Sequence, residues 1–346
     1  MPRVSICLPS LNHRRFLPER LDSIFGQSFG DWELIVVDGY SDDGSGDFFR
    51  RHAATEPRLR LFQAPREGIY PAWNYCLRHA TGEYVYIAPS DDTMAPDCLE
   101  RLVEALDARA DCDLAHCALR AVGAGAEELN AWWKARSLFA LGSNGLAQRS
   151  HLRLAPYDGL LHLYGESVYT SVTQLLIRRS LFAKIGVFDA AWGNAGDFHW
   201  SMRASLVTNT VHVPHTWGGW RLHAGQATQM HAIAHEERRE QLEHVIDDAL
   251  RQSWSRLPRA VQRGLVAGWR RFFWHRWELR RGLAARPSRG GRAGYLISQA
   301  AKGSPAPWSY VGDRLRTSFG SAVTPGDTVS DWLRSAGAAC ALVELH

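Results

Sequence analysis

The sequence of 346 residues is long enough for one large α/β domain with a smaller appendage and a sizeable core. Hydrophobic residues make up 45% and charged residues 22%, and no apolar run approaches the roughly 18 residues of a transmembrane helix, which excludes a membrane-spanning chain. Met1–Arg3 leads directly into a strand-like segment, which predicts no signal peptide and a cytoplasmic location. Six scattered cysteines without a C-x-x-C pair predict reduced, mostly buried thiols.

The first 120 residues alternate between strand-like and helix-like segments. Leu34–Val37 is an uninterrupted apolar run, typical of a strand that is covered on both faces of a parallel sheet. Strands are expected at 4–8, 34–37, 59–62 and 84–87, and helices at 17–25, 47–55, 69–80 and 99–106. The repeated β-α units predict an α/β fold with a doubly wound, mostly parallel, Rossmann-like sheet. Ligands in such sheets bind beyond the carboxyl ends of the strands.

The rest of the chain is less regular. The pattern is weak at 122–163, where loops around short helices are expected. A strand at 171–177, helices at 179–185 and 197–206, and a strand at 210–213 follow. From His231 onward the pattern is helical, in two long segments broken near Pro258, with a last short helix around 329–342.

Acidic residues follow two of the predicted strands. Asp38 precedes a loop rich in Gly, Ser and Asp, and it either caps a turn or hydrogen-bonds the base or ribose of a nucleotide. The pair Asp91-Asp92 follows the fourth strand. One of these two acids can bind a divalent cation that neutralises a diphosphate leaving group, and the alternative is a helix N-cap.

Five segments in register resemble the family 2 glycosyltransferases of the GT-A fold. The segments are 4–12 (VSICLPSLN), 34–45 (LIVVDGYSDDGS), 68–74 (GIYPAWN), 80–92 (ATGEYVYIAPSDD) and 96–99. The resemblance covers roughly residues 1–225. It implies a GT-A-like fold and an inverting transfer from a nucleotide-diphospho-sugar.

The resemblance also implies roles for single residues. Pro9 and Asn12 would line the nucleotide pocket, and Asp38 would bind the base. Asp91 would lie near the ribose or sugar, and Asp92 would ligate Mn²⁺ or Mg²⁺. Pro89 and Gly39 stand where the family often has further acids, so the assignment of Asp92 carries more weight.

An inverting transfer needs a carboxylate that takes the proton of the acceptor hydroxyl. The segment 185–203 resembles the stretch that leads to the family's catalytic acids, with Gly196 where Glu is common, so Asp197 is the expected base. The alternative for Asp197 is a helix N-cap. Asp189 is the fallback base, although a role in a turn fits it better.

Two further residues are candidate ligands. His223 lies in a segment that resembles the family's R-x-H step and would contact the metal or the diphosphate, while Arg66 would contact the diphosphate. A structural role is the alternative for both. Four tryptophans form either a sugar-stacking wall or part of the core: Trp192, Trp200, Trp217 and Trp220.

The segment from Arg251 to Arg292 holds 12 Arg, no Lys and one acid, Glu278. Aromatic residues lie among the arginines, which favours an anionic membrane surface as the partner. Packing or oligomerisation is the second interpretation, and a nucleic-acid patch is the least favoured.

Together these observations predict a catalytic domain at 1–225 and a helical, Arg-rich region at 226–346. The expected activity is metal-dependent transfer of a hexose-type sugar to a hydroxyl of a glycan or lipid-linked acceptor in cell-surface polysaccharide or glycoconjugate synthesis. The expected location is cytoplasmic, with peripheral contact to the inner face of the cytoplasmic membrane. The alternatives are a nucleotidyltransferase and a sugar-nucleotide-binding protein without turnover.

Overall fold

The structure is a computed structural model of the whole chain. It describes residues 1–137, 139–140, 143, 145–224, 235–269, 279, 282–283, 286, 288–303, 307–308, 325–337 and 342–345.

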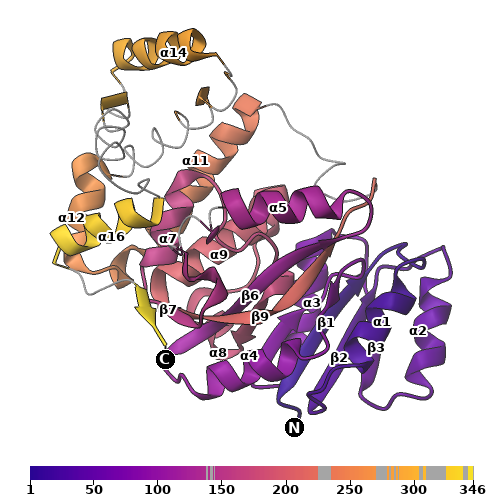
Figure 1. Cartoon of the computed structure of the whole chain (residues 1–346). Coiled ribbons are helices and arrows are strands. Elements are labelled where there is room, and N and C mark those ends of the chain that lie inside the picture. The colour runs from indigo at the N-terminus through magenta and orange to yellow at the C-terminus, as the bar shows by residue number, and fades with distance from the viewer. Residues whose placement is uncertain are drawn as a thin grey trace.

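A mixed sheet forms the centre of the molecule (Figure 1). Its strands are β1 (Val4–Ser10), β2 (Trp32–Asp38), β3 (Leu59–Gln63), β4 (Tyr84–Ile87), β5 (Thr93–Met94), β6 (Cys112–Val122), β7 (His151–Arg153), β8 (Leu175–Arg178), β9 (Asn209–Arg221) and β10 (Leu342–Glu344). Their order is β10-β7-β9-β6-β8-β4-β1-β2-β3, and β5 pairs with β9.

The N-terminal half of the sheet is parallel, as the β-α pattern predicts. β1 pairs in parallel with both β2 and β4, and β2 pairs in parallel with β3. β8 lies antiparallel between β4 and β6, and β6 then pairs in parallel with β9. The predicted α/β fold with a mostly parallel sheet is confirmed.

Helices cover both faces of this sheet. The helices that the structure describes, whether or not they lie on the sheet, are α1 (Leu17–Phe25), α2 (Ser45–Ala53), α3 (Ile69–His79), α4 (Cys98–Asp107), α5 (Ala126–Arg136), α7 (Tyr157–Leu161), α8 (Ser180–Ile185), α9 (Gly196–Val207), α11 (His235–Ser253), α12 (Arg259–Gly264), α14 (Arg289–Ala301) and α16 (Pro325–Ser335). Short turns include η3 (Val172–Gln174), η4 (Ala190–Ala195) and η5 (Trp254–Arg256), and η6 spans Leu265–Trp269.

The strand alternation creates two hydrophobic cores. Leu34 and Val36 of β2 face the core that α1, α2 and α4 cover, whereas Ile35 and Val37 face the core that α3, α7 and α9 cover. All four side chains are buried, which explains why this strand is an uninterrupted apolar run.

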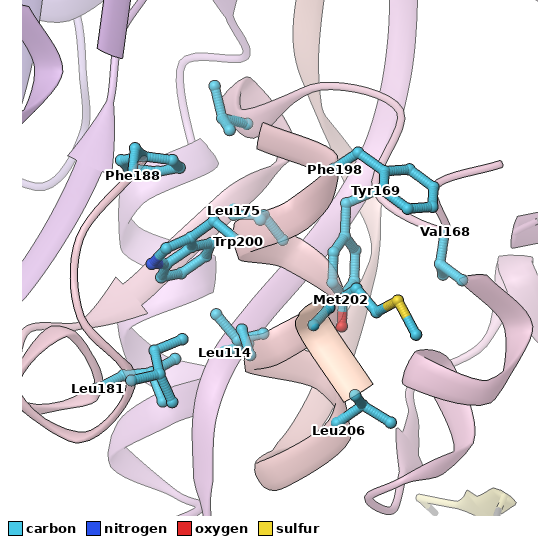
Figure 2. Close-up of a cluster of buried hydrophobic side chains, with 14 of the residues drawn as sticks. Leu114, Val168, Tyr169, Leu175, Leu181, Phe188, Phe198, Trp200, Met202 and Leu206 are labelled. Atoms are coloured by element: carbon cyan, nitrogen blue, oxygen red, sulfur yellow. The ribbon is translucent and has the colours of Figure 1, made fainter. Parts of the chain in front are cut away.

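Helix α9 crosses the second core and carries the predicted base at its first turn. Figure 2 shows Trp200, Met202 and Leu206 of this helix packed among apolar side chains from other elements. Trp200 is fully buried and its indole N–H donates to the Gly186 carbonyl at 3.0 Å. The packing of the later turns of α9 therefore fixes the position of its first turn.

The C-terminal region shares this second core. Val245 and Ile246 of α11 and Trp332 of α16 belong to the same cluster as Trp200, and α11 packs on α9. β10 joins the sheet beside β7, so the region is not helical throughout, and the last predicted helix ends at Ser335 rather than near 342. The boundary at 225 stays a prediction.

Residues 270–278, which hold most of the aromatic residues of the Arg251–Arg292 segment, lie outside the described residues. The helices that the structure does describe include none with the length and apolar character needed to span a membrane. Five of the cysteines lie in the described part, and all five are buried and unpaired, as predicted: Cys7, Cys76, Cys98, Cys112 and Cys117.

Candidate active site

Two buried polar groups lie next to each other where β1 and β2 end. Ser10 and Asp38 are partners in the parallel register, so their side chains lie on the same face of the sheet. Asp38 is 1% exposed, and its Oδ2 accepts a hydrogen bond from Ser41 N at 3.1 Å. Neither Asp38 Oδ1 nor Ser10 Oγ has a hydrogen-bond partner among the described residues. Leaving such a group unpaired costs about 1–3 kcal/mol, which makes these two atoms candidates for contacts with a ligand. Pro9, which precedes Ser10, lies opposite Val37 in the register of β1 and β2.

The loops that follow β1 and β2 are fastened to each other. Asn12 donates its backbone N–H to Ser41 Oγ at 2.9 Å and accepts from Asp42 N at 3.0 Å through its side-chain oxygen. Arg14 N donates to Asp43 Oδ2 at 2.7 Å. Asn12 and Tyr40 both have φ of 55°, in the left-handed region that non-glycine residues rarely adopt. The two loops therefore form one unit around the unpaired atoms.

Arg66 binds this unit rather than pointing away from it. Its Nε donates to the Gly39 carbonyl at 2.9 Å, and its Nη2 donates to the Tyr40 carbonyl and, at 3.2 Å, to Asp42 Oδ2. These contacts support a structural role for Arg66, which the sequence left open as the alternative to a diphosphate contact.

Asp91 and His223 lie side by side although 132 residues separate them in the sequence. His223 Nε2 is 3.0 Å from Asp91 Oδ2, and Arg15 Nη2 is 3.3 Å from His223 Nδ1. Next to them, His13 Nδ1 is 2.6 Å from Ser90 Oγ. His223 follows β9, and it lies here because the end of β9 contacts the loop between β4 and β5. The result is a mixed acidic and basic group at the carboxyl ends of β1 and β4.

Asp92 has a different environment from Asp91. Its side chain is buried, with 3% exposure, and its Oδ1 accepts from Arg221 N at 3.0 Å. Burial, and then the negative charge of Asp91, raise the pKa of the Asp92 carboxyl well above its ordinary value. Arg221 also donates to the Asp91 carbonyl and pairs with Glu19. Asp92 thus anchors the end of β9.

A divalent cation has two suitable donors here. No group of three or more His, Cys, Asp or Glu side chains arranged for a metal is found in the described parts of the chain. Asp91 and His223 nevertheless offer a carboxylate oxygen and an imidazole nitrogen within 3.0 Å of each other, on side chains that are 19% and 9% exposed. Such a pair fits Mn²⁺ when substrate oxygens and water complete its shell.

Asp197 lies in the first turn of the α9 helix. Its Oδ1 accepts from Phe198 N at 2.8 Å and from the Tyr70 hydroxyl at 3.2 Å. Asp189, the fallback base, instead caps η4 by accepting from Ala191 N at 2.9 Å. Of the two, Asp197 is the one on a long, well-packed helix.

The four tryptophans do not lie together. Trp200 belongs to the core, Trp192 packs against His199 and Trp220 against Trp133. Trp217 packs beside the other core and beneath Arg120. The core alternative therefore holds for Trp200, and a single stacking wall is not formed.

Several residues of this site were not predicted from the sequence. Ser10 is the last residue of β1, and His13 and Arg15 follow it, within or next to the first of the five family-like segments. Tyr70 lies inside the third of these segments. Their position in the segments was a signal, but only the folded chain brings them to Asp38, His223 and Asp197.

Comparisons with known proteins agree with this architecture. The sequence profile described as Glycosyl transferase family 2 matches residues 5–186. The EpsE protein of Bacillus subtilis (strain 168), named as a glycosyltransferase, is 36% identical over 108 residues, 31% of this chain and 39% of EpsE. TuaG of the same organism, named for teichuronic acid biosynthesis, is 34% identical over 104 residues, 30% of this chain and 41% of TuaG. The matched part thus spans about two fifths of these relatives.

Solved structures share the fold at low sequence identity. S. aureus TarS 1–349 in complex with UDP has a TM-score of 0.56 at 16% identity, covering 85% of this chain and 78% of TarS 1–349. The mannosyltransferase PcManGT from Pyrobaculum calidifontis, in complex with GDP-Man and Mn²⁺, has a TM-score of 0.54 at 20% identity, covering 97% and 86%.

Proposed function

The chain belongs to glycosyl transferase family 2, whose profile matches more than half of its length, and on this premise we propose that it is a metal-dependent, inverting glycosyltransferase. The donor is a nucleotide-diphospho-sugar, and the acceptor is a hydroxyl of a glycan or a lipid-linked sugar. The observation that carries the proposal is the pair of buried, unpaired polar atoms at Ser10 and Asp38.

These two atoms suit a nucleobase. The Asp38 carboxylate accepts a hydrogen bond, so it needs an N–H group, and the Ser10 hydroxyl can donate to a neighbouring carbonyl or ring nitrogen. A base bound there satisfies both groups at once. The complexes of the structural relatives with UDP and with GDP-Man support this class of ligand.

Asp91 and His223 would hold the cation, and substrate oxygens would complete its shell. Asp92 was the ligand expected from the sequence, but its burial and its bond to Arg221 N favour an anchoring role. When bound, the cation neutralises the negative charge that grows on the leaving diphosphate. Arg15, beside His223, adds positive charge on the same side.

Asp197 is the proposed base. It takes the proton of the acceptor hydroxyl while that oxygen forms a bond to C1 of the sugar and the bond from C1 to the diphosphate breaks. The N-terminal end of α9 and the Tyr70 hydroxyl both stabilise the ionised carboxylate that this step requires.

Cell-surface polysaccharide synthesis is the process that we propose, because TuaG is named for the synthesis of such a polymer. A lipid-linked acceptor would bring the chain to the inner face of the cytoplasmic membrane, and the Arg-rich segment provides the matching charge. We keep 1–225 as the catalytic part and 226–346 as the part that contacts the membrane or another copy.

Nucleotide binding is tested by thermal unfolding with UDP, GDP, CDP and ADP, each with and without Mn²⁺. A nucleotide at a hundredfold excess over its Kd should stabilise the fold by about 2.7 kcal/mol. Asp38→Asn and Ser10→Ala should lose this stabilisation, and Asp22→Asn, on the exposed side of α1, should keep it. If no nucleotide stabilises the wild type, the proposed function is wrong. Binding without transfer or donor hydrolysis supports the alternative of a sugar-nucleotide-binding protein.

Replacing Asp197 by Asn separates chemistry from binding. We expect kcat to fall by about 10²–10⁴-fold, because a general base contributes that much, while the Kd for the donor stays within a few-fold. Steady-state kinetics and donor titration give the two numbers, and NMR of the product should show inverted anomeric configuration. Retained configuration, or near-normal kcat, contradicts this mechanism.

A further inference from the structure

The position before the proposed base leaves no room for a side chain. A Cβ atom on Gly196 would lie 2.6 Å from Cε2 of Tyr70 and 2.8 Å from the Asp189 carbonyl oxygen. Contacts this short are not tolerated, and the Asp189 carbonyl is backbone that cannot rotate away. The ring of Tyr70 therefore occupies the space that a larger residue at 196 would need.

Tyr70 is held firmly in that space. Its side chain is 7% exposed and packs edge-on against Trp73 at 5.3 Å and in parallel with Phe188 at 6.1 Å. Gly68, with φ of 104°, turns the chain into α3 two residues earlier. The ring cannot leave without disturbing this aromatic cluster, so its hydroxyl has a fixed direction.

That hydroxyl points at the proposed base. Tyr70 OH donates to Asp197 Oδ1 at 3.2 Å, and Phe198 N donates to the same oxygen at 2.8 Å. Two donors on one oxygen fix the rotation of the carboxylate about its side-chain bonds. They also favour its charged form, because both hydrogen bonds strengthen when the carboxylate is ionised.

We propose that Tyr70 is a positioning residue for Asp197, and that the absence of a side chain at Gly196 is what allows it to reach the base. The inference rests on the proposed function, since it assumes that Asp197 takes the acceptor proton. Tyr70 acts through Asp197, by orienting the carboxylate and keeping it ionised.

Tyr70→Phe removes the hydroxyl and keeps the ring. We expect kcat to fall at least about tenfold, the donor KM to stay within about twofold, and the acidic limb of the kcat profile to move up by about half to one pH unit. Tyr75→Phe, on the same helix and without a described hydrogen bond from its hydroxyl, is the matched control and should change none of these. An unchanged kcat and pH profile in Tyr70→Phe would overturn the proposal.

A double variant tests the steric half of the proposal. Gly196→Ala should displace the Tyr70 ring and reduce kcat by a similar factor. If both changes act through the same contact, adding Tyr70→Phe to Gly196→Ala should cost less than about twofold more. Fully multiplicative losses would show that the two residues act independently and would contradict the inference.

A measurement without turnover separates this inference from the proposed function. In protein with ¹³C-labelled aspartate carboxyl groups, Asp197→Asn identifies the Asp197 signal by its loss. The pKa of that carboxyl should be higher in Tyr70→Phe than in the wild type, and unchanged in Tyr75→Phe. If the wild type transfers no sugar but this shift appears, the positioning contact stands and the proposed function fails. If transfer occurs and the shift is missing, the positioning role fails alone.

Discussion

At the scale of single residues, Asp91 and Asp92 are adjacent in the sequence but have different environments and different proposed roles. Asp91 lies partly exposed beside His223, whereas Asp92 is buried and holds Arg221 N. Because the folded pKa of Asp92 is raised, burying this carboxyl costs stability, and the cost grows as the pH rises from the ordinary carboxyl pKa to the raised one. Asp92 therefore has a structural contact with the end of β9, whereas Asp91 faces His223.

Asparagine at each position distinguishes the two roles. Asp91→Asn should weaken nucleotide diphosphate binding at least about tenfold in the presence of Mn²⁺ and leave metal-free binding unchanged, because one cation ligand is lost. Asp92→Asn keeps an oxygen for Arg221 N and removes the buried charge, so its free energy of unfolding at pH 7.5 should equal or exceed that of the wild type. Calorimetric titration and urea unfolding provide the measurements. The opposite pattern would restore Asp92 as the metal ligand.

At the scale of elements, regular apolar patterns allowed accurate predictions. The fourth strand was expected at 84–87, where β4 lies, and the third helix at 69–80 agrees with α3 within one residue. β6 was missed because Cys112–Val122 holds three Ala, two Cys and only one β-branched residue. β9 was predicted for only four of its residues, since Pro214 and two glycines interrupt the pattern.

The same glycines show why tertiary contacts escape a sequence pattern. A Cβ on Gly218 would lie 2.3 Å from the Thr173 carbonyl oxygen, and one on Gly219 would lie 2.2 Å from Thr93 Oγ1. These glycines allow close packing within a strand instead of ending it. Asp38 and Asp91 could be predicted because they follow clear strands. Tyr70 could not, since its partner Asp197 is 127 residues away.

Helix α11 supports α9 through a polar contact as well as through the core. His199 Nε2 is 2.8 Å from Asp248 Oδ2, which also accepts from Gln252 Nε2. Asp248→Ala should lower the free energy of unfolding by about 1–3 kcal/mol, because buried His199 loses its partner. Glu243→Ala, on the same helix without a described hydrogen bond, should cost less than about 0.5 kcal/mol. Urea denaturation compares the two variants, and equal losses would contradict a specific role for the His199–Asp248 contact.

At the scale of the whole molecule, buried histidines make stability depend on pH. His116, His151, His162 and His212 are all fully buried. Burial is the largest cause that lowers the pKa of each one, to about 4 for His151 and His162. The unfolded chain therefore takes up protons before the folded chain does. Stability that is present above pH 6.5 is lost as the pH falls from 6.5 toward 4.

His162 permits a clean test because, among the described residues, its ring nitrogens hydrogen-bond only to Asp158 O and Ser167 Oγ. Between pH 7.5 and 5.5 its titration should cost the wild type about 1 kcal/mol. His162→Gln should therefore lose about 1 kcal/mol less than the wild type over this interval, whereas His244→Gln, at an exposed position, should lose the same as the wild type. The raised pKa of Asp92 changes stability with pH in the opposite direction, but by the same amount in the wild type and in both variants. Parallel urea curves at the two pH values measure the difference, and identical losses would show that His162 is not the titrating group.

The pairing of β10 with β7 has a consequence for the order in which the chain folds. Arg149, which precedes β7, and Glu344 of β10 are 195 residues apart, whereas β1, β2, β3 and β4 meet across short connections. Closing a longer loop costs more entropy, and long-range contacts slow folding. The parallel half of the sheet should thus form early and β10 should dock late. Until it does, β7 presents unpaired main-chain groups to other molecules, so refolding yield should fall as protein concentration rises.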